Sequence, residues 1–185
     1  MARTNATDAI GRFSVPLALV ARAVARRGHG SNPAEPIDLI PPKPGTSYQR
    51  LVEGAWVVRR DGWYYLFYSG DNCCGDKAHY AVMVARSRSA TGPFRSLGEV
   101  RRRPESTILV RSERWNAPGH NSIVTDSAGQ DWTFYHAIDP AKPTNDDAGG
   151  DRRVMLMDRV TYRGGWPVIG GGMPTTGRRP GPRAR

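Results

Sequence analysis

An aromatic strand that recurs after 67 residues constrains the fold of this chain more than any other feature. In each copy a short apolar strand leads to a glycine turn, and a strand rich in aromatic residues follows. The corresponding residues are Gly62 and Gly129, Tyr65 and Trp132, Phe67 and Phe134, and Tyr68 and Tyr135. A repeat of this length has room for about four strands, which is the size of a propeller blade. The sequence therefore predicts two consecutive blades.

Short strands separated by turns fill the chain between Leu51 and Ile169. Asp61-Gly62 is typical of a tight hairpin turn, and no helical periodicity lasts for three turns. Strands are expected at 56–58, 63–68, 80–85, 108–110, 122–124, 132–135, 154–157 and 166–169. No stretch approaches the roughly 18 apolar residues that a membrane-spanning helix needs. The pattern predicts an all-β domain and no membrane partner.

The net charge of +10 is concentrated at the two ends of the chain. Residues 1–30 and residues 174–185 each carry a net charge of +4, which leaves +2 for the middle. A fold that binds nucleic acid would carry the excess on its folded surface, so no nucleic-acid partner is expected. The ends also lack a core-forming pattern. We expect a helical or disordered basic extension and linker at 1–36, a folded part at 37–172 and a basic disordered tail at 173–185.

Two further features leave alternatives open. Cys73 and Cys74 are adjacent, so they are either reduced thiols or a vicinal disulfide, and they cannot connect distant segments. The apolar stretch at 14–25 is interrupted by Arg22, which argues against a secretory signal peptide. Both a cytoplasmic and a secreted location stay open.

Blade symmetry also relates two residues that could carry chemistry. Glu53 and His120 are separated by the same 67 residues, and each precedes the first strand of its repeat. Because the innermost strands of neighbouring blades line one central channel, we expect the carboxyl group and the imidazole to lie near each other.

A set of motifs in a fixed order makes the middle of the chain resemble a known family. The set consists of VEGAW at 52–56, YYLFYS at 64–69, ARSRSATGPF at 85–94, APGHNS at 117–122, QDW at 130–132, YHA at 135–137, DRV at 158–160 and GWP at 165–167. Together they are similar to the C-terminal part of glycoside hydrolase family 43, the arabinanase and β-xylosidase family. The resemblance covers about Ile37 to Ile169, and it implies the last two blades of a five-bladed β-propeller.

The resemblance implies an inverting glycosidase that acts on arabinose- or xylose-containing plant cell-wall polysaccharides. Inversion needs a general acid and a carboxylate base on opposite faces of the sugar. The family's acid is the glutamate of the motif at 52–56, which is Glu53. The family's axial histidine corresponds to His120 and implies a possible calcium ion, held through waters because calcium prefers oxygen ligands. No organic cofactor is implied.

Four further residues are candidates for substrate binding: Trp56, Ser69, Asn72 and Arg153. Ser69 and Asn72 follow the aromatic strand, where they could meet a sugar hydroxyl or simply cap a hairpin. Arg153 precedes a strand, but Arg152 is an equal alternative in register. His79 and His136 are expected to be structural.

The chain departs from the family pattern before Glu53. The family's base Asp and a second Asp that tunes the acid should precede it, and the acids there are Asp8, Glu35 and Asp38. None matches a motif, so neither role is assigned. The sequence predicts a fragment whose exposed blade faces, at Tyr65, Phe67, Trp132 and Phe134, promote self-association. The alternative is a non-catalytic, carbohydrate-binding propeller remnant.

Overall fold

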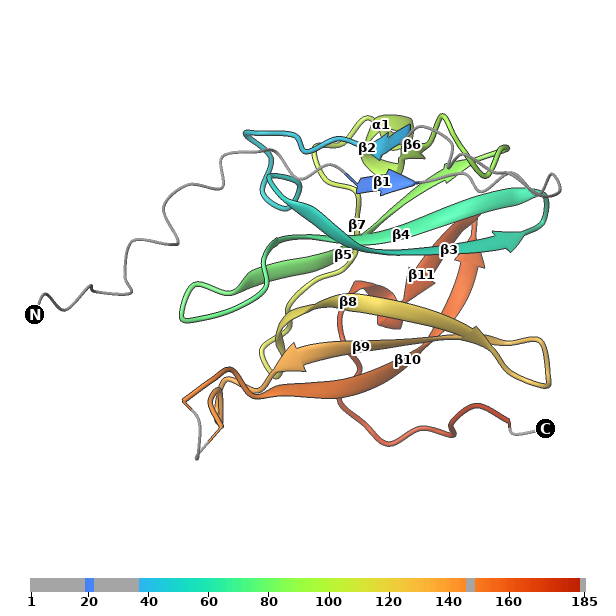
Figure 1. Ribbon diagram of the computed structural model, residues 1–185. Coiled ribbons are helices and arrows are strands. Elements are labelled where there is room, and N and C mark those ends of the chain that lie inside the picture. Colours follow the sequence, from blue (N-terminus) through green and yellow to red (C-terminus); the bar gives the residue numbers. More distant parts are fainter. Residues whose placement is uncertain (1–18, 22–36, 146–148, 184–185) are drawn as a thin grey trace, which may run out of the picture.

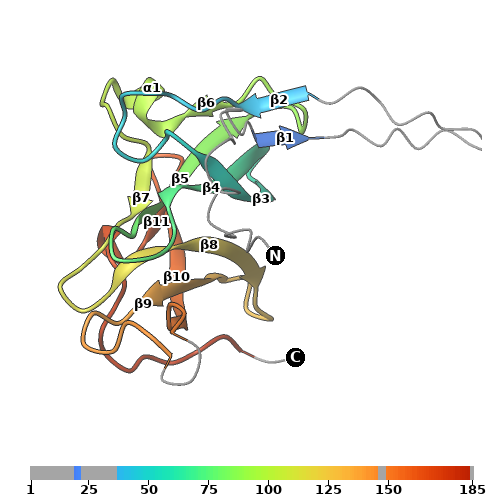
Figure 2. The same ribbon diagram turned by 60° about the vertical axis from the view of Figure 1, so that its left-hand side comes forward.

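The computed structural model describes residues 19–21, 37–145 and 149–183. It shows two large β-sheets stacked on each other, each made of antiparallel strands, and a small sheet of β1 and β2 (Figures 1 and 2). The first sheet has the order β3 (Val52–Arg60), β4 (Trp63–Asn72), β5 (His79–Ser87) and β6 (Arg95–Ser96), and β7 (Thr107–Leu109) also pairs with β5. The second has the order β11 (Trp166–Ile169), β10 (Arg153–Arg163), β9 (Asp131–Ile138) and β8 (Asn116–Thr125).

These sheets confirm the prediction of two blades from the 67-residue repeat. The predicted turn at Asp61-Gly62 joins β3 to β4, and both residues have the positive φ angles that a tight hairpin turn requires. Two short helical elements complete the blades, namely α1 (Leu97–Arg101) and η1 (Gly170–Gly172). The Ser96 hydroxyl accepts a hydrogen bond from the Glu99 N–H, and the Glu99 carboxylate accepts one from the Ser96 N–H, so α1 begins at a capping box.

The N-terminal part differs from the sequence expectation in one place. Residues 19–21 form a strand, β1 (Leu19–Ala21), which pairs antiparallel with β2 (Ile37–Ile40). Helix or disorder is the expectation from the sequence, but a three-residue strand is stable here because β2 supplies its backbone hydrogen bonds. The rest of the predicted extension lies outside the described residues. No helix in the described ranges is long and apolar enough to cross a bilayer.

The main hydrophobic core lies between the two blades. Its largest side chains come from facing strands of the two sheets: Tyr65, Phe67, Leu109, Tyr135 and Trp166. The expectation that Tyr65, Phe67 and Trp132 line exposed faces is therefore wrong, because all three are buried. Phe134 alone of the four is partly exposed.

An ion pair ties the far end of β3 to the second blade. Arg60 donates a hydrogen bond to the buried carboxylate of Asp131 at 2.8 Å. Asp131 also accepts from Thr125 at 2.6 Å and from Tyr162 at 3.0 Å. Burial and the negative charge of Asp131 raise the pKa of Tyr162, which therefore stays a neutral donor. These contacts fix the orientation of one blade against the other.

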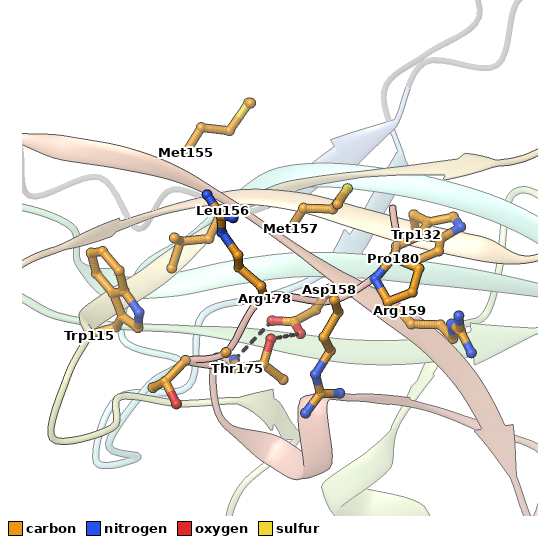
Figure 3. A pocket seen from close by; sticks show the side chains of 13 residues that line it. Trp115, Trp132, Met155, Leu156, Met157, Asp158, Arg159, Thr175, Arg178 and Pro180 are labelled. Carbon is orange, nitrogen blue, oxygen red and sulfur yellow. Dashed lines mark hydrogen bonds between the residues drawn. The ribbon is translucent and has the colours of Figure 1, made fainter. Parts of the chain in front are cut away.

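Both outer faces of the blade pair are covered by the chain's own segments. Leu39, Ile40 and Tyr48 pack on the outer face of the first sheet. On the second sheet, residues 174–183 run across β10, where Thr175 donates from its N–H and its hydroxyl to Asp158 (Figure 3). The sequence predicts a disordered tail at 173–185, whereas the described part of it is held by these bonds. A groove of about 560 Å³ stays open between this segment and β10.

Candidate active site

One end of the two sheets gathers the residues that the sequence singles out. At this end β3, β5, β8 and β10 begin, and β4 and β9 finish (Figure 1). Glu53 lies on β3, Ser69 on β4, His120 on β8 and Arg153 on β10. Antiparallel pairing therefore brings these four residues to the same end of the molecule.

Bulges in the two innermost strands position Glu53 and His120. The pairing of β3 with β4 shifts register between Glu53 and Trp56, where Gly54 has a φ of 61°. The pairing of β8 with β9 shifts register on both sides of Gly119, and His120 has a φ of 52°. A Cβ atom on Gly54 would lie 3.3 Å from the His120 Cα atom. The structure thus places His120 against the backbone beside Glu53, and the expected approach of the imidazole to the carboxyl group stays a prediction.

The carboxyl group of Glu53 on β3 meets a buried tyrosine of β5, two strands away in the same sheet. The Tyr80 hydroxyl donates a hydrogen bond to Glu53 Oε1 at 2.6 Å. Tyr80 is 1% exposed, whereas Glu53 is half-buried and stays open to the solvent side. Burial and the hydrogen bond to Glu53 raise the pKa of Tyr80 well above its ordinary value, so the phenol keeps its proton.

Two of the residues predicted to bind sugar, Ser69 and Asn72, use their polar groups in hydrogen bonds within the protein. The buried Ser69 hydroxyl accepts a hydrogen bond from the His120 N–H at 2.8 Å. Asn72 donates from Nδ2 to the Lys77 carbonyl at 3.0 Å, and the Cys74 N–H donates to its Oδ1 at 3.5 Å. Ser69 thereby holds the bulge of β8, and Asn72 holds the loop between β4 and β5. Their roles in binding sugar stay predictions.

The other two candidates reach outward. Trp56 is 40% exposed on β3, three residues beyond Glu53. Arg153 begins β10 and is exposed, and its positive charge acts on Tyr80 and on His136. Arg153 therefore lies near Tyr80 and His136. The exposed side chains of Trp56 and Arg153 are free to meet a ligand.

His136 lies beside Tyr80 and His120, although the sequence marks it as structural. Its ring stacks on Tyr80 with centroids 5.8 Å apart and lies 6.4 Å from the ring of His120. Within the described part of the chain, neither ring nitrogen has a hydrogen-bond partner, and both are buried. Burial lowers the pKa of His136 to about 4, with smaller contributions from Arg153 and His120. His136 is thus a neutral imidazole next to Tyr80, the residue that bonds to Glu53.

Acidification is expected to destabilise the protein partly through His136. An unfolded imidazole has a pKa of about 6.5, against about 4 for His136 in the folded chain. The unfolded state therefore binds more protons between these values, so stability is lost as the pH falls through this window. The groups facing the ring are Tyr80, His120 and Arg153.

The measurement is the melting temperature at about pH 7 and about pH 5, where the proton-linked difference should be visible. The fall in melting temperature between the two values should be smaller in His136→Phe, which keeps a ring against Tyr80, than in the wild type. An equal fall in the wild type and in His136→Phe would contradict the lowered pKa.

The loop between β4 and β5 contains a disulfide between the adjacent residues Cys73 and Cys74. This resolves the two alternatives that the sequence leaves open in favour of the vicinal disulfide. The loop is tied to the second blade, because the Gly75 N–H donates to Asp151 Oδ2 at 2.8 Å. Cys73 also packs against a small cluster that includes Tyr80 and Ala117. The disulfide thus lies close to Tyr80, the residue that bonds to Glu53.

Among the described residues, His120 is the candidate metal ligand that the sequence predicts, and it has few potential ligands around it. Among residues 19–21, 37–145 and 149–183, no three His, Cys, Asp or Glu side chains are grouped so that they could hold one. Calcium takes six to eight oxygen ligands, which a single imidazole does not supply. The side chains described here therefore do not by themselves fit a calcium ion.

The two antiparallel sheets, packed on each other, form two blades of a propeller-like fold. The model of the Glycosyl hydrolases family 43 matches residues 28–167, which is most of the chain. The chain belongs to this family, as the order of its motifs predicts.

Known proteins similar to this chain include a fungal enzyme and two solved structures. The probable arabinan endo-1,5-alpha-L-arabinosidase A of Aspergillus fumigatus is 28% identical over 127 residues, which are 64% of this chain and 38% of that protein. The alpha-L-arabinanase of Cellvibrio cellulosa, solved with arabinohexaose, is 28% identical with a TM-score of 0.51 over 64% of this chain and 36% of that chain.

A thermostable family-43 glycoside hydrolase is 25% identical with a TM-score of 0.63, and the match covers 82% of this chain and 46% of that one. These matches confirm the propeller fold. The chain spans less than half the length of each of these three proteins.

Proposed function

We propose that this chain is an arabinan-directed glycoside hydrolase in which Glu53 is the general acid. The observation that carries the proposal is the half-buried Glu53 carboxyl group at the bulge of β3, which accepts a hydrogen bond from Tyr80 and precedes Gly54, the residue packed against His120. Arabinan is favoured over xylan because the fungal relative and the Cellvibrio enzyme are both named for arabinan or arabinanase activity.

The proposed reaction proceeds with inversion. Glu53 gives its proton to the glycosidic oxygen while the bond from that oxygen to the anomeric carbon breaks. A water molecule attacks the anomeric carbon from the opposite face, and a carboxylate base takes up the proton of that water. None of the described carboxylates is assigned as the base. A positioned acid alone supplies only part of the acceleration, roughly 10²- to 10⁴-fold, so turnover by this chain is expected to be slow.

The unassigned base supports a second candidate, a carbohydrate-binding propeller unit without catalysis. Trp56 and Arg153 are exposed at the open end, where an aromatic face and a cation suit a sugar ring and its hydroxyl groups. This candidate predicts heat of binding with arabino-oligosaccharides in calorimetry and no release of reducing ends.

Release of reducing ends from linear 1,5-arabinan and from xylan, measured in parallel with the purified chain, tests the proposal. Arabinan products whose anomeric configuration is inverted in proton NMR would support it. Binding without products would favour the carbohydrate-binding unit. Equal or faster release from xylan would contradict the assignment to arabinan.

Calcium enters the proposal only as a possible structural ion. We propose that any calcium ion at His120 completes its coordination shell with water molecules, because the side chains within the described ranges supply no metal-binding group of three His, Cys, Asp or Glu residues. No step of the reaction is routed through it.

A further inference from the structure

We propose that Tyr80 is a positioning residue that fixes the Glu53 carboxyl group for proton donation, an inference that rests on the proposed function. The Tyr80 hydroxyl lies 2.6 Å from Glu53 Oε1 and donates to it. The two residues come from strands that are not neighbours, because β4 lies between β3 and β5. The contact therefore depends on how the blades are folded and not on sequence proximity.

The ring of Tyr80 is fixed from several sides. Its backbone pairs with Asp71 of β4, and one ring face stacks on His136 of β9 with an interplanar angle of 7°. On β8 the ring lies so close to Gly119 that a Cβ atom there would overlap it. Since Tyr80 is only 1% exposed, its ring has no room to rotate, and the hydroxyl has one fixed place.

The direction of this hydrogen bond decides which oxygen of Glu53 carries the transferable proton. Tyr80 donates to Oε1, so Oε1 is an acceptor and the proton of the acid lies on Oε2. When that proton moves to the glycosidic oxygen, Glu53 becomes a carboxylate. A hydrogen bond to an ionised acceptor is stronger than one to a neutral acceptor. Tyr80 therefore stabilises the transition state more than the ground state.

Tyr80→Phe tests this role because it removes the hydroxyl and keeps the ring. We expect kcat on arabinan to fall roughly tenfold with KM unchanged, since the lost bond is stronger in the transition state. An aryl arabinoside with a good leaving group needs little protonation. On that substrate kcat should change less than about twofold.

Tyr135→Phe is the matched control. Tyr135 is also buried and also donates to a carboxylate at 2.6 Å, but its partner is Asp158 on β10. Removing that hydroxyl should affect both substrates alike. Equal losses on the two substrates in Tyr80→Phe, or no loss on either, would overturn the inference.

A second measurement does not depend on turnover. The ¹³C resonance of the Glu53 carboxyl carbon, identified by its disappearance in Glu53→Gln, should move in Tyr80→Phe and stay in place in Tyr135→Phe. An unmoved resonance in Tyr80→Phe would overturn the inference. If the wild type turns over neither substrate, the proposed function fails, and this resonance alone then decides whether Tyr80 fixes Glu53.

Discussion

Replacement of Glu53 with glutamine is expected to lower the rate of arabinan hydrolysis by roughly 10²- to 10³-fold. Glutamine has nearly the same shape, and its amide oxygen can still accept the Tyr80 hydrogen bond that Glu53 Oε1 accepts. It has no acidic proton to give to the leaving oxygen. The loss therefore reports the missing proton and not a disturbed fold.

The leaving group of the substrate separates this effect from a general loss of structure. On an aryl arabinoside with a good leaving group, Glu53→Gln should lose less than about tenfold, because such a group departs without protonation. Glu113→Gln, at an exposed glutamate outside the site, is the matched control and should behave as the wild type. A loss of the same size on both substrates would mean that Glu53 is not the proton donor.

The blade architecture could be predicted from the sequence because it rests on local patterns. The glycine turns and the aromatic strands repeat with one spacing, and the two sheets follow it. The same spacing also related Glu53 to His120, and the bulges at Gly54 and Gly119 place His120 against the backbone beside Glu53. A repeated spacing in the sequence is sufficient to predict the positions of strands and turns where each blade repeats the same geometry.

Tyr80 and His136 could not be found in the same way. The contacts of Tyr80 with Glu53 and with His136 join three strands of two sheets, and they require that Gly119 has no side chain. No spacing in the sequence encodes such a contact. The nearest signal was the glycine of the motif at 117–122, which marks a close approach without naming what approaches.

The exposure of the blade faces was predicted wrongly for a different reason. Two open blades were expected to leave Tyr65 and Phe67 partly uncovered, but these residues face the second sheet. Trp132 lies beside Pro180 of the C-terminal segment (Figure 3). Composition alone predicts disorder for a segment rich in Gly, Pro and Arg. It cannot show that Thr175 finds a buried acceptor in Asp158.

Gly70 is a position where a single methyl group should destabilise the protein strongly. It lies on β4, and the chain at 48–51 crosses directly over it. A Cβ atom there would lie 2.5 Å from the Leu51 carbonyl oxygen, 2.6 Å from Met83 Cε and even closer to the Tyr48 carbonyl oxygen. Carbonyl groups of a crossing segment cannot turn aside as a side-chain tip can. The Leu51 carbonyl also accepts a hydrogen bond from the Asp71 N–H at 3.1 Å, which holds the crossing in place.

Gly70→Ala is therefore expected to lower the free energy of unfolding by about 3 kcal/mol, at the upper end of the usual cost of overpacking. In urea the midpoint should fall with the slope unchanged, because the native state must shift and the unfolded state does not. Gly150→Ala is the matched control, since a Cβ atom at Gly150 meets open space and should change stability by less than about 0.5 kcal/mol. Equal midpoints for the two variants would show that the segment at 48–51 is not fixed over β4.

The contact matters for the site as well, because Ser69, which holds the bulge at His120, is the residue before Gly70. A shift of β4 should therefore reduce the activity of the Gly70→Ala protein even below its melting temperature.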